Sequence, residues 1–438
     1  MKVPEKPKEL QDIIRKNSSK VFKLLDDKSV MDFIVKCNRE YIHWDKLRYE
    51  NIPNEKNPEH IWAIMKIFRS QQYKPLKFNG WSFKYLLLDD ALKKLHLMDK
   101  GAAGHLETGL ESVNTGGKSR YIISTLMEEA IASSQLEGAA TTRKIAKEIL
   151  RLSKRPRNYS EQMIINGYET MQKIIKMTDE PLTPEIIIEL QKNITKNTLK
   201  DAYDEGHFRN TNEIVVADPL KYERIYYTPP DYKIIKDLIE EFCEFANNDD
   251  GDFIHPVIKG IILHFLIGYI HPFSDGNGRT ARTIFYWYVL SRGYWLFEYM
   301  SVSRIILRSK TKYSLAYLYT ETDENDLTYF INYNLNAIEE ALHDMETYID
   351  KRQKEYSEAL VLIRDIKDIN LRQTGLLKEF MKNPEKIFVI NEIMTTYNVA
   401  YDTARNDLLH LTELGHLEKI KMKNKYLFKL SKKNIRPW

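Results

Sequence analysis

Two long apolar segments stand on either side of a short polar loop in the second half of the chain. Residues 256–270 are apolar with the composition of a helix, and residues 280–290 form a second apolar run. Because the residue before a proline is disfavoured in the α conformation, the first helix should end near His271. The second should start at Gly278, which leaves residues 276–279 where backbone N–H groups have no intrahelical partner. Such a helix terminus favours the binding of anions.

Upstream of this pair, residues 121–138 have the periodicity of an amphipathic helix. Its inward stripe, with intervals of four, three, four and three, consists of Ile123, Met127, Ala130, Ser134 and Glu137. Gly138 suits the position just after a last helical turn. A carboxylate at Glu137 meets the negative end of the helix dipole and needs a cation, and Arg282 is the cation we predict. The alternative is that Glu137 is a solvated residue at a helix end.

Two other patterns concern a hairpin and a long helix. Short β-rich runs at residues 213–216 and 224–227 flank Asp218-Pro219 and predict a β-hairpin, whose exposed edge can pair with an extended segment of a partner. The alternative is a hairpin that only covers the core. From Asp326 a long helix is expected with a heptad seam at Ile331, Leu335, Ile338, Leu342, Met345 and Ile349. We favour core packing for this seam over a coil that makes a homodimer.

The C-terminal residues 371–438 predict three helices and a strand pair. The helices are expected around 376–381, 391–396 and 403–414, and the strands at 417–420 and 426–430. This order resembles a winged helix-turn-helix with residues 403–414 as its recognition helix. The segment holds 13 Lys and Arg against 7 Asp and Glu, whereas the net charge of the whole chain is +4. A basic wing is compatible with DNA, bound through phosphates, or with a docked protein, and the sequence leaves both open.

Length and cysteine content limit the class of protein. A chain of 438 residues exceeds one typical core, and we predict a helical region at 1–110, a core at 111–370 and a third domain at 371–438. The only cysteines, Cys37 and Cys243, form no framework and are expected to be buried thiols in a reducing compartment. Neither a signal peptide nor an apolar stretch of membrane-spanning length is evident, so a cytoplasmic protein without a membrane partner is expected.

The loop between the apolar helices carries the chemistry of a polyphosphate site. Glycines at 276 and 278 remove Cβ atoms where phosphate oxygens would touch the backbone, and Asp275 offers a hard oxygen ligand for Mg²⁺. Arg279 and Arg282 lie three apart on one helix face, which suits more than one phosphate. No Gly-Lys-Ser/Thr follows, so this is not a Walker loop. The pattern indicates transfer of a group from a nucleotide.

Histidines near this loop differ in expected role. His271, with an ordinary pKa near ~6.5, can take the proton from an attacking hydroxyl. His264 lies seven residues earlier, but no further ligand is evident beside it, and a buried structural histidine is the better interpretation.

The run from His271 to Arg282, His-Pro-Phe-Ser-Asp-Gly-Asn-Gly-Arg-Thr-Ala-Arg, resembles the signature of the Fic family at every fixed position. The resemblance implies a mainly α fold with a helical core and a small hairpin flap, and transfer of AMP from Mg·ATP to a Ser, Thr or Tyr hydroxyl of a target protein. By this resemblance the general base is His271 and the magnesium ligand is Asp275. The resemblance also implies that Asn277 and the amides around Gly276 and Gly278 bind the α- and β-phosphates, Arg279 the β-phosphate and Arg282 the γ-phosphate.

Residues 133–138, Ser-Ser-Gln-Leu-Glu-Gly, also resemble the inhibitory motif of that family, which implies self-inhibition by Glu137 paired with Arg282. The flap of Fic proteins aligns the target, which makes Val215 a candidate contact for target and nucleotide. Two other functions stay open: a DNA-binding regulator whose Fic core senses nucleotide or modifies itself, and removal of AMP from a target by the same site.

Overall fold

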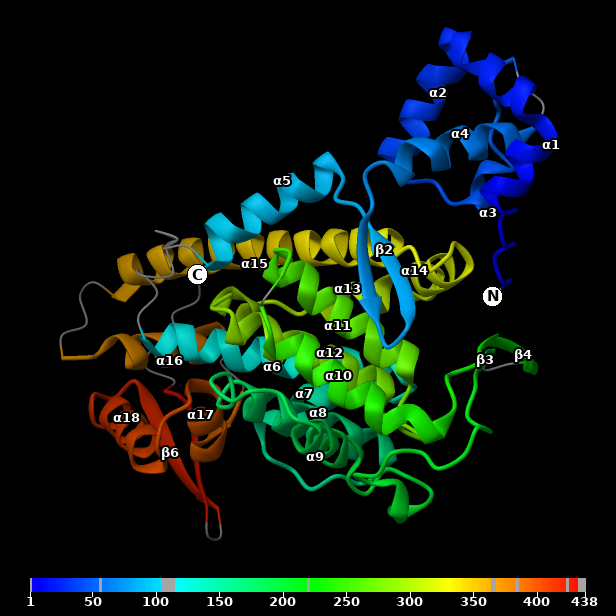
Figure 1. Cartoon of the computed structure of the whole chain (residues 1–438). Helices are drawn as coiled ribbons and strands as arrows, with labels where there is room; N and C mark the ends of the chain where they lie inside the picture. The colour runs from blue at the N-terminus through cyan, green and yellow to red at the C-terminus, as the bar shows by residue number, and fades with distance from the viewer. Residues whose placement is uncertain are drawn as a thin grey trace.

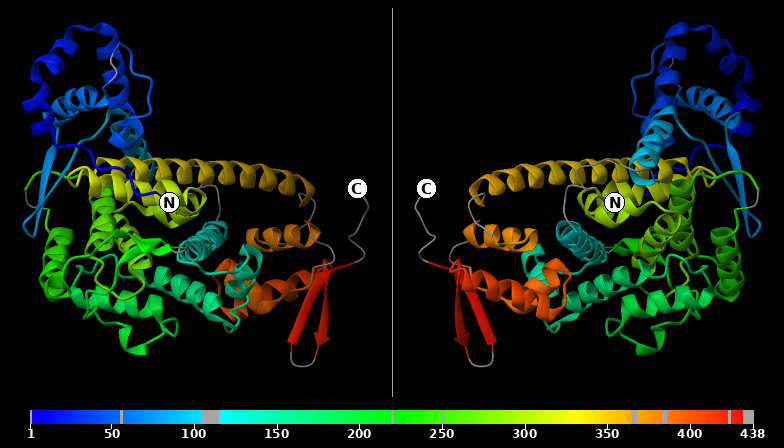
Figure 2. Two further views of the ribbon diagram at one scale, coloured as in Figure 1. Left: turned by 90° about the vertical axis from the view of Figure 1, so that its right-hand side faces the viewer. Right: turned by 90° about the vertical axis from the view of Figure 1, so that its left-hand side faces the viewer.

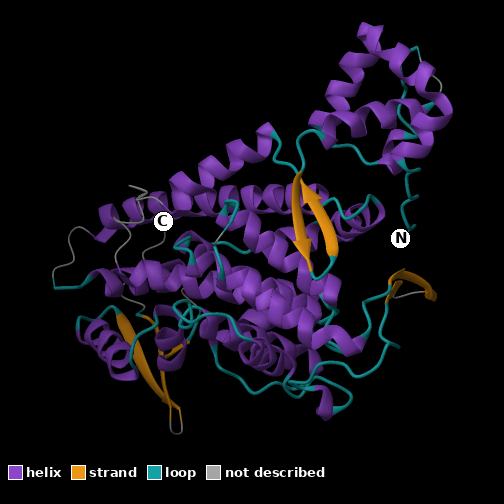
Figure 3. Cartoon of the chain, viewed as in Figure 1, coloured by secondary structure: helices purple, strands orange, loops and turns teal. Residues whose placement is uncertain are grey.

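The computed structural model describes residues 2–54, 57–103, 115–218, 221–249, 251–363, 368–382, 386–422 and 425–431. Figure 1 shows a small helical unit at the N-terminus, a large helical core, and a C-terminal unit that packs against the core. Helices dominate, and the strands belong to three small sheets (Figure 3). The predicted mainly α class is confirmed.

The helices and strands follow one another along the chain in three groups. The N-terminal part contains α1 (Leu10–Lys23), η1 (Leu24–Asp26), α2 (Lys28–Arg39), α3 (Trp44–Leu47), α4 (Pro58–Ser70), β1 (Lys74–Phe78), β2 (Trp81–Tyr85), α5 (Asp89–Met98) and η2 (Asp99–Ala103). Next come α6 (Thr115–Leu136), α7 (Arg143–Arg151), α8 (Tyr159–Ile174), α9 (Pro184–Thr195), η3 (Ala202–Asp204), β3 (Val216–Asp218), β4 (Lys221–Tyr227), η4 (Tyr232–Ile234) and α10 (Ile235–Asn247). The rest are α11 (Pro256–Ile270), α12 (Asn277–Ser291), η5 (Trp295–Tyr299), α13 (Val302–Arg308), α14 (Lys310–Thr322), α15 (Thr328–Ile363), α16 (Leu371–Lys382), β5 (Phe388–Val389), α17 (Ile390–Tyr397), α18 (Tyr401–Glu413), β6 (Leu417–Met422) and β7 (Lys425–Leu430).

Helices α11 and α12 form the centre of the core. They pack against each other, and nearly every side chain of both is buried. A helix that is apolar on all sides must be surrounded by other elements, which explains the unbroken apolar runs in the sequence. Around them lie α6, α8, α9, α10 and α15. The polar loop between α11 and α12 is thus held by two of the most deeply buried helices in the molecule.

The long helix α15 runs along the core from beneath the N-terminal unit toward the C-terminal unit (Figure 2). Its predicted seam packs inward: Ile331, Leu335, Ile338 and Met345 belong to the main apolar cluster, and Leu342 packs against it. Core packing of this seam is therefore confirmed as far as Met345, and the side chain of Ile349 lies outside the described residues. No described helix is long and apolar enough to cross a membrane.

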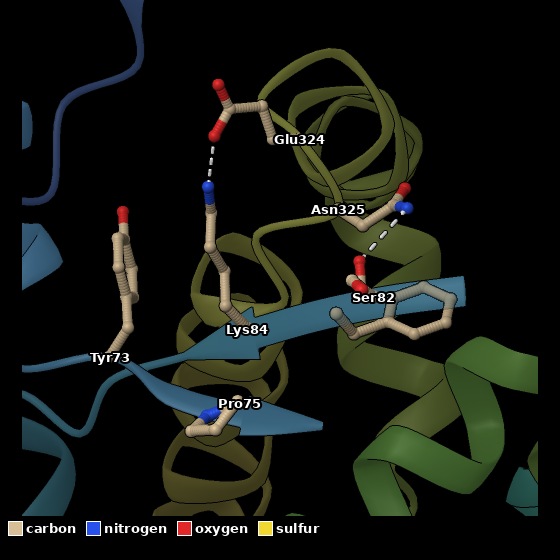
Figure 4. Close-up of a pocket in the computed structure, with 7 residues that line it drawn as sticks. Tyr73, Pro75, Ser82, Lys84, Glu324 and Asn325 are labelled. Atoms are coloured by element: carbon tan, nitrogen blue, oxygen red, sulfur yellow. Dashed lines mark hydrogen bonds and ion pairs between the residues drawn. The ribbon is translucent and has the colours of Figure 1, made fainter. Parts of the chain in front are cut away.

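The N-terminal unit has an apolar cluster of its own and joins the core through a buried polar contact. Lys66 of α4 donates to Asp323, which follows α14, at 2.8 Å, and both side chains are almost fully buried. The hairpin β1–β2 packs on the main core instead, since Phe78, Phe83 and Tyr85 belong to its apolar cluster. A shallow pocket lies between this hairpin and the turn from α14 to α15 (Figure 4). It is lined by Tyr73, Pro75, Ser82, Phe83, Lys84, Glu324 and Asn325.

The predicted hairpin before α10 is present with shifted bounds. β3 and β4 pair antiparallel, with Val216 opposite Tyr227 and Ala217 opposite Ile225. The first strand starts at Val216, three residues later than expected, and Val215 precedes it as a half-buried residue. The hydroxyl of Tyr227 donates to the Tyr269 carbonyl at 2.8 Å and ties the hairpin to the end of α11.

The C-terminal unit contains the helices and strands that were predicted, in the predicted order. In addition β5 completes a three-stranded sheet of order β5–β7–β6. Its apolar cluster, from Leu376 to Leu430, is separate from that of the core. The helix α17 packs against α6 and α7 (Figure 1). Its classification as a winged helix-turn-helix stays a prediction.

Candidate active site

The polar loop is shaped by two left-handed backbone positions. His271 follows the last residue of α11 with φ of 50°, and its N–H donates to the Ile267 carbonyl at 2.9 Å. Gly276 precedes α12 with φ of 87° and accepts the first bond of that helix from the Thr280 N–H at 2.9 Å. Helix α12 therefore starts at Asn277, one residue before the predicted start. The N–H groups of residues 277–279 precede that first bond and form the positive helix end.

The side chain of Asn277 closes the loop on itself. Its Oδ1 accepts from the Phe273 N–H at 3.0 Å, and its Nδ2 donates to the Phe273 carbonyl at 2.7 Å. Asn277 is 3% exposed, so both bonds are shielded from water. The resemblance assigned this residue to phosphate binding, whereas in the structure its side chain fixes the loop and its backbone N–H faces the helix end.

Two residues distant in sequence hold the loop from outside. The Arg209 guanidinium donates to the His271 carbonyl at 2.9 Å, and the Arg209 N–H donates to the Pro272 carbonyl at 2.9 Å. Gln191 of α9 donates to the Asp275 carbonyl at 3.2 Å. Both side chains are buried. Sequence reasoning assigned neither of them to the site, because a lone buried arginine or glutamine has no motif of its own.

His271 is held in one orientation by its neighbours. Its Nδ1 lies 3.3 Å from the Gly268 carbonyl, an arrangement in which Nδ1 carries the proton and Nε2 is left as the acceptor. Burial lowers the pKa of His271, and the nearby Arg209 lowers it further, although the Gly268 carbonyl opposes the shift. The imidazole is therefore neutral at pH 7 and able to accept a proton.

Arg279 and Asp275 form a pair at the mouth of the loop. The guanidinium of Arg279 lies 3.4 Å from the Asp275 carboxylate and donates to the Ile194 carbonyl at 3.1 Å. Arg279 is 3% exposed, while half of the Asp275 side chain is in solvent. A carboxylate open to water and beside a helix end that attracts phosphate fits a Mg²⁺ ion that arrives with its substrate, since Mg²⁺ keeps several waters and few protein ligands. Among the described residues no group of three His, Cys, Asp or Glu side chains could hold a metal by itself.

Arg282 is directed at α6 and at the residue that follows it. Its guanidinium lies 2.8 Å from Oε1 of Glu137, and it also donates to the Ser133 hydroxyl at 2.9 Å and the Ser133 carbonyl at 3.1 Å. Burial opposes the charge of Glu137, but Arg282 outweighs it and lowers the pKa of this carboxyl. The predicted contact between Glu137 and Arg282 is present.

The Glu137 carboxylate lies directly over the start of α12. A Cβ atom at Gly278 would collide with Oε1 of Glu137 and come within 3.2 Å of the Arg282 guanidinium. The absence of a side chain at Gly278 is thus what admits an anionic group to this position. Gly138 has φ of 95°, which turns the chain immediately after Glu137 and agrees with its predicted place beyond the last helical turn.

The remaining histidine of α11 is structural. Nε2 of His264 lies 2.8 Å from the Tyr313 hydroxyl, and burial lowers the pKa of His264 to about 3. A neutral, hydrogen-bonded core histidine agrees with the interpretation made from the sequence. The two cysteines are free and buried, also as predicted.

Comparisons with known proteins match the centre of this chain to one family. Residues 181–289 match the model of the Fic/DOC family. The protein adenylyltransferase Fic of Nematostella vectensis is 22% identical over 229 residues, which cover 51% of this chain and 49% of that protein. The protein of the same name from Drosophila grimshawi is 24% identical over 161 residues, 37% of this chain and 29% of that protein. The matches thus span half of these curated relatives or less.

Solved structures of Fic proteins are similar to the chain as well. A Fic family protein from Desulfovibrio desulfuricans G20 aligns over 79% of this chain and 96% of its own, with 15% identity and a TM-score of 0.46. Fic-1 of C. elegans aligns over 81% and 90%, with 15% identity and a TM-score of 0.48. The family match over residues 181–289 and the loop geometry together identify a Fic domain within this chain.

Proposed function

We propose that this protein is a protein adenylyltransferase, which transfers AMP from Mg·ATP to a hydroxyl group of a target protein and is inhibited by its own Glu137. The observation that carries the proposal is the grouping of a neutral, oriented His271 with two buried arginines around the start of α12. The names of its relatives, protein adenylyltransferase Fic, support the same chemistry.

In this reaction the target hydroxyl oxygen bonds to the α-phosphorus of ATP, and the bond from that phosphorus to the bridging oxygen of pyrophosphate breaks. Nε2 of His271 accepts the hydroxyl proton. The N–H groups at the start of α12 and the Arg279 guanidinium hold the phosphates, which fixes the α-phosphorus for in-line attack. Asp275 would hold Mg²⁺, and the ion, when bound, neutralises charge on the phosphates.

Glu137 restrains the site by competing with the nucleotide. Its carboxylate already pairs with Arg282 over Gly278, where a phosphate oxygen would accept from the same donors. A phosphate tail that cannot reach Arg282 leaves the α-phosphorus misaligned, and misalignment of about 1 Å can cost on the order of 10²-fold in rate. Inhibition therefore needs no folding change in the core.

The hairpin β3–β4 is the element we propose for target contact. Ile225 of β4 is 50% exposed, and Val215 lies just before β3 at half burial. An extended segment of the target can add to a strand edge through backbone hydrogen bonds, which gives register with little side-chain selectivity.

Mass spectrometry of the purified chain after incubation with Mg·ATP tests this function. We expect the Glu137→Gly variant to gain the mass of AMP on itself, at a rate roughly 10- to 100-fold above the wild type. A gain of phosphate, or no covalent change in the variant, contradicts adenylyl transfer. An equal rate in both proteins contradicts inhibition by Glu137 and leaves the transfer reaction intact.

A second candidate function, DNA binding by the C-terminal unit, is favoured by a specific surface. Arg405 and Asn406 are exposed on α18, and Lys419 and Lys421 are exposed on β6. Asp407 is instead buried and paired with Arg372 at 3.2 Å, which removes its charge from that surface. A His271→Ala variant separates the functions, since it should lose transfer of label from α-labelled ATP and keep any gel shift with duplex DNA.

We propose a cytoplasmic location, because two free, buried thiols suit a reducing compartment.

A further inference from the structure

One face of α7 carries a row of cations that links the inhibitory helix to the C-terminal unit. Arg143, Lys147 and Arg151 are spaced four apart, so they lie on the same side of the helix. Arg143 and Lys147 both pair with Glu128 of α6. Arg151, one turn further on, lies 2.5 Å from Glu392 of α17. The row therefore joins α6 at one end and the C-terminal unit at the other.

Glu392 is the buried carboxylate at the contact between α7 and the C-terminal unit. Its side chain is 8% exposed, and its second cationic partner is Lys386 of its own unit at 2.8 Å. A carboxylate buried at an interface is stable only while its cations stay in place, so separation of α7 from α17 leaves one of them unsatisfied. Further contacts add to the junction, since α17 lies against both α6 and α7 and α16 also lies against α6.

The same α6 ends at Leu136, immediately before Glu137. Glu137 reaches Arg282 only if the last turn of α6 stays against the start of α12, where Ser133 also accepts from Arg282. Any contact that holds α6 and α7 in this position raises the fraction of molecules in which Glu137 is paired with Arg282.

We propose that the C-terminal unit, docked through Glu392 on Arg151, positions α6 and α7 so that Glu137 stays on Arg282, and that this docking sets the basal level of inhibition. The inference rests on the proposed adenylyl transfer. Arg151 and Glu392 are positioning residues: they touch neither the loop nor the nucleotide, and they act through Glu137. Release of the contact shifts the population toward the uninhibited state without altering the catalytic loop.

The test uses the whole chain of 438 residues with the substitution Arg151→Gln, which leaves Glu392 paired with Lys386 and so preserves the C-terminal unit. Lys154→Gln is the matched control, because it removes the same charge near the end of α7 from a residue paired with the exposed Glu148. Arg151→Lys is the conservative variant. We expect self-adenylylation to rise on the order of three- to tenfold in Arg151→Gln and to stay at the wild-type level in both others.

Two further measurements separate this inference from the function on which it rests. Amide hydrogen exchange of residues 130–138 should be faster in Arg151→Gln and unchanged in Lys154→Gln, whether or not the protein transfers AMP. Equal exchange and equal activity in the two variants would overturn the proposal. In a Glu137→Gly background Arg151→Gln should add no further activity, and an added rise there would also overturn it, because the effect would not pass through Glu137. Absence of transfer in Glu137→Gly alone contradicts the function, while the exchange result still decides the docking.

Discussion

Two glutamates of the α6 region illustrate how differently one segment can hold a carboxylate. Glu129 lies in the middle of α6, 2% exposed, and accepts from the Tyr286 hydroxyl at 2.9 Å, the Ser301 hydroxyl at 3.0 Å and the Ser303 N–H at 3.0 Å. Burial raises its pKa. Glu137 lies just beyond the helix, with 35% of its side chain exposed, and Arg282 lowers its pKa.

This difference indicates that the Glu129 carboxyl has a structural role, whereas the Glu137 carboxylate can be displaced from its partner. The partners of Glu129 are neutral hydroxyl and amide groups from α12 and from the start of α13, and no solvent ion can replace a group buried among them. The partner of Glu137 is a guanidinium at the mouth of a phosphate site, and a nucleotide phosphate can take the place of the carboxylate there. Loss of Glu129 should therefore cost stability, and loss of Glu137 should change activity.

The largest effect is expected when the proposed base, His271, is removed from the uninhibited variant Glu137→Gly. The double variant Glu137→Gly, His271→Ala should transfer label from α-labelled ATP at least about 100-fold more slowly than Glu137→Gly, since it lacks the imidazole that takes the hydroxyl proton. Binding of ATP should be retained, which calorimetry checks. Equal rates in the two proteins would show that the released activity does not depend on the proposed base.

The substitution Glu129→Ala tests whether Glu129 has a structural role. Removal of the carboxyl leaves the buried donors of Ser301 and Ser303 without an acceptor, whereas the Tyr286 hydroxyl can still donate to the Met300 carbonyl at 3.0 Å. We expect a loss of about 2–4 kcal/mol in the free energy of unfolding. Glu137→Ala should lower that free energy by about 1 kcal/mol or less, because 35% of the Glu137 side chain is exposed and Arg282 keeps its bonds to Ser133. Urea unfolding followed by circular dichroism measures both. Comparable losses for the two variants would remove the distinction.

The pH dependence of transfer follows from the lowered pKa of His271. The imidazole must be neutral to accept a proton, so kcat/KM should be constant as pH falls to about 6.5 and decline, roughly tenfold per unit, only below the lowered pKa. The Glu137 carboxylate raises the pKa of His271, and the decline should therefore occur at lower pH in Glu137→Gly than in the wild type. A decline that starts above about pH 6.5, the ordinary histidine value, contradicts a buried neutral base.

The smallest effect is expected at the cation that caps α6. Nζ of Lys310 donates to the Leu136 carbonyl at 2.7 Å, next to Glu137. Lys310→Ala should weaken the last turn of α6 and raise self-adenylylation roughly two- to fivefold. Lys312→Ala, an exposed lysine on the same helix, is the control and should leave the rate unchanged. A fall in activity with Lys310→Ala would assign that lysine to nucleotide binding instead.

The sequence was most informative where local pattern determines structure. Apolar runs predicted α11 and α12, and Pro272 predicted the end of the first helix near His271. The left-handed backbone at Gly276 suits a glycine, whereas that at His271 was not predicted. The contact from Glu137 to Arg282 was predictable because a carboxylate at a helix end needs a cation. The resemblance of residues 133–138 to the inhibitory motif indicated Arg282 as that cation.

Long-range partners were not predictable in the same way. Arg209 and Gln191 reach the loop from segments far away in sequence, and Glu129 is one acidic residue in an ordinary helix. The inward turn of the Asn277 amide depends on loop geometry that no periodicity encodes. The contact between Arg151 and Glu392 joins the core to the C-terminal unit, and a local sequence pattern carries no information on such a contact between units.

The central claim is that the Glu137 carboxylate occupies the place of a nucleotide phosphate over Gly278. Calorimetric titration of Mg·ATP into the wild type and into Glu137→Gln tests it most directly, because the amide keeps the size of the side chain and removes its charge. The account predicts about tenfold tighter binding by Glu137→Gln, with the gain absent when ADP, which lacks the γ-phosphate, replaces ATP. Equal affinity of both proteins for ATP, or an equal gain with ADP and ATP, would contradict it.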